Sequence, residues 1–115
     1  FETSLLDKSK YQVQIKDIIS LSIDKIYTSE EVVDKEIAGY KVISDILNVF
    51  TTALVNKQED NASNYDRLML RTLPEFYRKT DGSIYNILLS TCCYVASLSD
   101  SAAILLHKKI MGMEI

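Results

Sequence analysis

Apolar residues recur along this chain every three or four positions, the spacing that places them on one face of an α-helix. The most regular run covers residues 29–55, where a polar row follows the opposite face. A second amphipathic run covers residues 9–27. The chain has one Pro and three Gly. Long helical periods with so few turn-forming residues favour an all-α fold over sheets joined by turns.

An uncharged stretch between Asp81 and Asp100 predicts the central element of this fold. Its apolar residues fall on two adjoining helical rows, and the third stripe is only mildly polar, so no face is marked for water. Asn86 and several hydroxyl groups make the stretch too polar for a membrane span. We therefore expect about five helices packed around a central helix near residues 83–98.

The helix expected at residues 29–55 has two further local signals. Thr28-Ser29-Glu30-Glu31 has the form of a capping box at its start. Gly39 in its middle costs about 1 kcal/mol relative to Ala. Close approach of another helix would explain that glycine.

The second half of the chain is divided by polar segments and turn residues. Residues 56–64 predict a linker, and the short helix that follows ends at Pro74, which lacks an amide donor. The segment Thr80–Gly82 predicts a chain reversal. Ser99 is the expected N-cap of a last helix, and Gly112 its C-terminal cap.

Composition fits one globular domain over residues 1–115, with 47% hydrophobic and 25% charged residues. A net charge of −3 gives no reason to expect nucleic acid or an anionic membrane as partner. The adjacent Cys92 and Cys93 cannot pair within a helix, so we expect reduced core thiols and a cytoplasmic location. The first residue is Phe1 rather than Met, which suggests a piece of a longer chain.

The sequence contains few residues that could ligate a metal or take part in catalysis. The sequence has one His and no Cys-x-x-Cys or His-Asp pair, so it predicts neither a metal centre nor a catalytic residue. His107, beside Lys108 and Lys109, is interpreted as a helix-terminal or interface residue. The three glycines are scattered and form no phosphate-binding loop.

Basic residues near aromatic ones give the candidates for nucleotide binding. Arg and Lys at such places could hold a phosphate or a base, although a solvated surface is the competing interpretation. The candidate residues are Arg67, Arg71, Tyr77, Arg78 and Lys79.

Two stretches of the chain resemble the C-terminal region of dGTPase-like deoxynucleoside triphosphate triphosphohydrolases. In that family a Tyr-x-Ser element precedes a helix beginning Glu-x-x-Gly-Tyr, and a later stretch reads Tyr-Ile-Ser-Gly-Met-Thr-Asp. The matching residues here are Ile26–Val33, Glu36–Ile43, Ile46-Leu47, Tyr94–Asp100, Ala103 and Lys109–Gly112. The resemblance covers roughly residues 20–55 and 83–112. Cys93, Ser97 and Leu98 depart from it, since the family usually has Asp, Gly and Met there.

The resemblance implies a helical domain behind an HD-type catalytic core, in which a His…His-Asp…Asp set holds a divalent metal such as Mg or Mn. That core releases triphosphate from a deoxynucleotide, and none of its catalytic residues has a counterpart in this sequence. The implied partners are the catalytic half of the same chain, further copies in a homo-oligomer, and a deoxynucleotide at the edge. The alternative is a free-standing helical protein-interaction module without catalysis.

Overall fold

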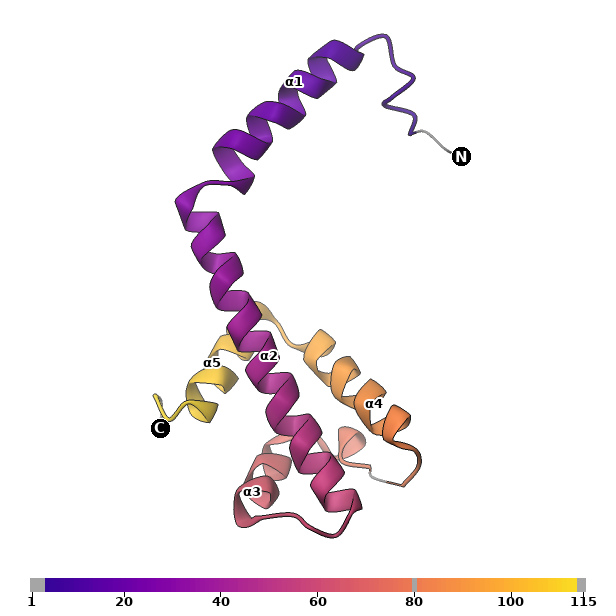
Figure 1. Ribbon diagram of the computed structural model, residues 1–115, viewed down its shortest axis with the longest axis vertical. Coiled ribbons are helices and arrows are strands. Elements are labelled where there is room, and N and C mark those ends of the chain that lie inside the picture. The colour runs from indigo at the N-terminus through magenta and orange to yellow at the C-terminus, as the bar shows by residue number, and fades with distance from the viewer. Residues whose placement is uncertain (1–3, 80, 114–115) are drawn as a thin grey trace. The chain divides into compact units, whose positions relative to one another are not determined.

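The computed structural model describes residues 4–79 and 81–113, in which every regular element is helical. The elements, shown in Figure 1, are α1 (Gln12–Ser22), the π-helical η1 (Ile23–Tyr27), α2 (Glu30–Gln58), α3 (Asn64–Thr72), the 3₁₀-helical η2 (Glu75–Tyr77), α4 (Ile84–Ser97) and α5 (Asp100–Ile110). The prediction of an all-α protein with about five helices is confirmed. The chain divides into two compact units, residues 1–39 and 40–115, which are described separately. The single domain expected over residues 1–115 stays a prediction.

The first unit contains α1 and η1, and none of their residues, all of which the structure describes, is buried. At η1 the backbone hydrogen bonds join residues five apart instead of four. The Thr28 N–H, for example, donates to the Ile23 carbonyl at 3.0 Å. The Thr28 and Ser29 hydroxyls also donate backwards, to the carbonyls of Ile23 and Ile26. The capping box expected at the start of α2 stays a prediction, because a hydroxyl that donates to the preceding turn can still accept from an N–H.

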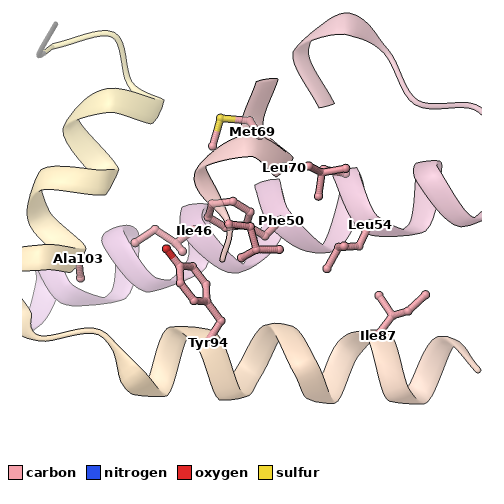
Figure 2. Packing of buried hydrophobic residues seen from close by; sticks show 10 residues of the cluster. Ile46, Phe50, Leu54, Met69, Leu70, Ile87, Tyr94 and Ala103 are labelled. Atoms are coloured by element: carbon pink, nitrogen blue, oxygen red, sulfur yellow. The ribbon is translucent and has the colours of Figure 1, made fainter. Parts of the chain in front are cut away.

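The core of the second unit is built on α2. Ile46, Phe50, Ala53 and Leu54 of this helix have no exposed surface. They form one cluster with Met69 and Leu70 of α3, Ile87 and Tyr94 of α4, and Ala103 of α5. Figure 2 shows Ile46, Phe50 and Leu54 of α2 among these residues. The Phe50 and Tyr94 rings meet edge to face, with centroids 5.5 Å apart. Each fully buried large side chain contributes about 1.5–3 kcal/mol through its transfer from water.

Within the described residues protein does not surround the uncharged helix α4, although the sequence marks none of its faces for water. In α4 only Ile87, Thr91 and Tyr94 are buried, and they form one face. Tyr85 on the other side is 70% exposed. Cys92 and Cys93, expected in the core, are both exposed. With apolar residues on most sides of α4, hydropathy could not indicate which face contacts α2.

Gly39 does not mark a close helix approach. A Cβ atom added there would meet nothing within 4 Å among the described residues. The glycine thus has no packing explanation in this structure.

The helix ends of the second unit follow the sequence more closely. Ser99 caps α5, since its hydroxyl accepts from the Ala102 N–H at 3.1 Å, as predicted. At the other end the Met113 N–H donates to the Lys108 carbonyl, and Gly112 has a φ of 71°. This is a Schellman motif, so the predicted glycine cap is confirmed.

The end of α2 repeats that motif without a glycine. The Asn61 N–H donates to the Asn56 carbonyl at 2.8 Å, and Asp60 takes the left-handed position with a φ of 56°. The helix therefore extends to Gln58, into the predicted linker. In the reversal predicted at Thr80–Gly82, Thr80 lies outside the described residues, and Gly82 has a φ of 128°.

Within the part of the chain that the structure describes, no single helix is long and apolar enough to cross a membrane. Only α4 and α5 taken together have the length and composition, and they bend by 118° at the break between them.

Candidate functional site

The end of α2, the helix α3 and the residue after η2 line a basic hollow of about 280 Å³. We call this cavity the basic hollow. It is lined by Lys57, Asp60, Ala62, Arg67, Leu70, Arg71 and Arg78. Three of the five nucleotide-binding candidates are thus brought together, and Lys57 joins them. Sequence reasoning missed Lys57, because it lies inside the polar segment, residues 56–64, that was interpreted as a linker.

Arg78 is the most firmly positioned cation of the hollow. Its Nε donates to the Leu73 carbonyl, and its Nη2 donates to the Arg71 carbonyl at 3.3 Å. The guanidinium therefore satisfies carbonyls that the end of α3 leaves without helical partners. The Lys57 Nζ lies 3.4 Å from the Arg78 carbonyl oxygen and brings the end of α2 to the same point.

Arg67 and Arg71 lie one turn apart on the exposed side of α3. The Arg67 Nη1 donates to the Asn64 side-chain oxygen at 3.2 Å. Arg71 has no side-chain hydrogen bond or ion pair within residues 4–79 and 81–113. Its charge is therefore available to a ligand without loss of an internal contact.

A buried carboxylate fixes the start of α3 beneath the hollow. Asp66, only 7% exposed, accepts from the Asn56 amide at 3.0 Å and from the Ser63 N–H at 3.1 Å. The Asn56 hydrogen bond, followed by the backbone hydrogen bond from Ser63, lowers the pKa of Asp66 below its ordinary value. Asn56 adjoins Lys57 and Asp66 adjoins Arg67, so this contact sets the separation of the hollow's two sides.

Ser63 completes a capping box with Asp66, because its hydroxyl accepts from the Asp66 N–H at 3.1 Å. The sequence signal was present as a Ser-x-x-Asp pattern before an amphipathic turn. The polar segment around it was interpreted as a linker, and the cap was missed.

The two remaining candidates, Tyr77 and Lys79, line a second hollow of about 350 Å³ together with residues of α4. The Lys79 Nζ lies 5.6 Å from the centroid of the Phe76 ring. The Tyr77 ring packs against Phe76 and Tyr94, at centroid distances of 5.1 and 5.3 Å. Burial, with a smaller effect of Tyr77, raises the pKa of the Tyr94 hydroxyl. Tyr77 therefore packs at the edge of the core, and the five candidates do not form one site.

His107 lies between α5 and α2, where its Nε2 is 2.8 Å from Asp45 Oδ2. Its position agrees with the interface interpretation. No group of three or more His, Cys, Asp or Glu side chains suited to a metal ion occurs among the described residues.

Comparison with known proteins extends the resemblance to the whole chain. No family model matches it. Over 115 residues, its full length, the chain is 29% identical to a deoxyguanosinetriphosphate triphosphohydrolase-like protein of Synechocystis sp., covering 26% of that protein. It is 25% identical over 126 aligned positions to proteins of the same description from Listeria monocytogenes and Listeria innocua, with 98% of the chain and 27% of each relative covered. The resemblance to dGTPase-like proteins is confirmed, and the chain spans about a quarter of the length of these relatives.

Proposed function

We propose that this chain is the C-terminal helical part of a dGTPase-like deoxynucleoside triphosphate triphosphohydrolase. In this proposal it packs against the part of the protein that removes triphosphate from a deoxynucleotide, and it contributes contacts between copies. The observation that carries the proposal is the match of the whole chain to about a quarter of each dGTPase-like relative.

The metal implied for such an enzyme does not fit the residues of this chain. An HD-type centre needs several histidines and carboxylates that converge. The sequence has one histidine, and no group of three suitable side chains forms among the described residues. The metal would therefore be held elsewhere in a longer protein, and no catalytic step is assigned to this chain.

An exposed apolar surface on α4 supports the packing role. We call it the α4 face: Ile84, Tyr85, Leu88, Leu89 and Cys92. Its four large residues are between 41% and 70% exposed. Tyr85 and Leu89 lie on the side away from Ile87 and Tyr94, and Ile84 and Leu88 lie at the border of that side. A contiguous apolar surface of this kind is typical of an interaction site. Relatives about four times as long as this chain supply a natural occupant, namely the remainder of the same protein.

Enzyme assays on two lengths of protein test the proposal. The natural protein that contains this chain should release triphosphate from at least one deoxynucleoside triphosphate in the presence of Mg²⁺ or Mn²⁺. The 115-residue chain alone should release none above a metal-only control, because it lacks the ligands for metal-activated water. Release of triphosphate by the chain alone would overturn the proposal. So would a longer protein that releases no triphosphate from any of dATP, dCTP, dGTP and dTTP.

A surface variant tests the packing role separately. Tyr85→Ser should leave the stability of the isolated chain within about 0.5 kcal/mol, because the side chain is 70% exposed. In the longer protein it should lower the unfolding temperature and the specific activity together. Asn48→Ser, at an exposed polar position of α2, is the matched control and should change neither protein. Equal behaviour of the two variants in the longer protein would contradict an α4 face that is covered there, and would favour a free-standing module.

A further inference from the structure

The basic hollow has a charge balance opposite to that of the protein. Four cationic side chains and one carboxylate line it, an excess of three positive charges, whereas the whole chain carries a net charge of −3. None of Lys57, Arg67, Arg71 and Arg78 forms an ion pair with a carboxylate of the described residues. Their charges are therefore not neutralised inside the chain.

Internal contacts set the positions of two of these cations, Arg78 and Lys57, before any ligand arrives. Arg78 is held by two carbonyls of α3, and Lys57 is held by the Arg78 carbonyl. The contact between Asn56 and Asp66 fixes the end of α2 against the start of α3. Binding loses less free energy when the contacting groups are already ordered, so the arrangement favours ligand binding over a solvated surface.

Three of the four cations are arginines, which bind phosphate oxygens through two parallel N–H donors. The volume of about 280 Å³ is near the lower limit of small-molecule sites, which begin at roughly 300 Å³. It suits a compact anion better than a whole nucleotide. An excess of three positive charges matches a chain of phosphates better than a single one.

We propose that the basic hollow binds an oligophosphate, either free or as the phosphate chain of a nucleoside triphosphate whose nucleoside stays outside. Arg71 and Arg67 contact the phosphates from α3, Lys57 contacts them from α2, and Arg78 forms the rigid base. The carboxylate of Asp60 weakens binding because it stands beside the same anion. This inference does not rest on the proposed enzymatic role, since the described residues of the chain supply every group in it.

Calorimetric titration of the 115-residue chain, shown to be helical by circular dichroism, tests the site without divalent metal ions present. Sodium tripolyphosphate should bind with a Kd below about 1 mM, and pyrophosphate and phosphate should bind progressively more weakly. Equal affinity for dGTP and tripolyphosphate would identify the phosphates as the whole ligand, and tighter binding of dGTP would identify a nucleotide as the source. Binding of dGTP without tripolyphosphate, or no binding of any oligophosphate, would overturn the proposal.

Three substitutions separate the site from general electrostatic attraction. Arg71→Gln should weaken tripolyphosphate on the order of tenfold, because one charge-assisted contact is lost. Lys109→Gln removes the same charge from exposed surface on α5 and should leave the Kd unchanged. Asp60→Asn should tighten binding, and Asn tolerates the left-handed φ of 56° at this position.

Equal weakening by the substitutions at Arg71 and Lys109, or no tightening by Asp60→Asn, would overturn the site. A twelve-residue single-stranded oligonucleotide that binds much more tightly than tripolyphosphate would also overturn it, in favour of a nucleic-acid surface. Because all readouts are binding constants of this chain, the inference can fail while the longer protein still hydrolyses deoxynucleotides. It can equally hold where the enzymatic proposal fails.

Discussion

His107 Nε2 lies 2.8 Å from Asp45 Oδ2, which joins α5 to α2 across 62 positions of the sequence. The Lys41 Nζ lies 2.9 Å from the other oxygen of the same carboxylate. The His107 hydrogen bond, followed by the Lys41 hydrogen bond, lowers the pKa of Asp45 below its ordinary value of 3.8. The ionised carboxylate is thus the form that the folded chain prefers.

The lowered pKa of Asp45 predicts a loss of stability in acid. Its stabilising effect should be fully present above pH 3.8, the ordinary value of the unfolded chain, and should disappear as the pH falls through the lower pKa of the folded chain. The difference in unfolding free energy between wild type and Asp45→Asn, measured by urea denaturation, should therefore be constant near neutral pH and shrink below pH 3.8. Asp17→Asn, on exposed surface of α1, should give a curve parallel to wild type. A difference between wild type and Asp45→Asn that does not depend on pH would contradict the assignment.

The N-cap of α5 gives a second prediction. Because the Ser99 hydroxyl accepts from the Ala102 N–H, Ser99→Ala should lower the unfolding free energy by about 1 kcal/mol, and Ser99→Asp should retain most of it. Ser101→Ala changes a neighbouring exposed serine in the same helix and serves as the control. Equal denaturation midpoints for the variants at Ser99 and Ser101 would show that the cap contributes nothing.

Core and surface aromatics should differ sharply in their effect on stability. Phe50→Ala removes a ring with no exposed surface and should cost about 3–5 kcal/mol in unfolding free energy. Tyr85→Ala removes a ring that is 70% exposed and should cost less than about 0.5 kcal/mol. Thermal and chemical denaturation of the 115-residue chain measure both. A large loss with Tyr85→Ala would mean that α4 buries a different face from the one described.

The exposed α4 face predicts self-association of the chain on its own. Apolar surface left uncovered by any other part should pair with a second copy, so the average mass in sedimentation equilibrium should rise with protein concentration. Replacing Tyr85 and Leu88 together by Ser should shift the association to higher concentration, whereas Asn48→Ser should not. A chain that remains monomeric throughout the concentration range would contradict this prediction.

Periodicity predicted the helices because each long run keeps its apolar residues on one side. The same periodicity did not indicate which of these apolar residues are most deeply buried. In α2, Phe50 and Leu54 are buried, yet Ile37 and Tyr40 of the same apolar row are 64% and 78% exposed. Sequence spacing specifies which residues share a face, but tertiary packing decides how much of that face is covered.

The candidate site was predicted in part, for a related reason. Arg67 and Arg71 share a side of one helix, and a four-residue spacing is sufficient to place them together. Lys57 and Arg78 join them only because Asn56 binds Asp66 and Arg78 binds the end of α3. Such contacts depend on how the chain turns after α2, which residue spacing alone does not contain. The separation of Tyr77 from the arginines has the same origin, since its ring packs against Tyr94 of α4.

The adjacent cysteines of α4 provide independent chemical reporters for two surfaces. Neighbouring residues on a helix point about 100° apart, so Cys92 belongs to the α4 face while Cys93 lines the second hollow. Alkylation followed by mass spectrometry can therefore follow each surface in one unmodified protein. Protection of the Cys92 thiol with continued labelling of Cys93 would locate a bound partner on the apolar side of the helix, and the reverse pattern would locate it beside Phe76 and Lys79.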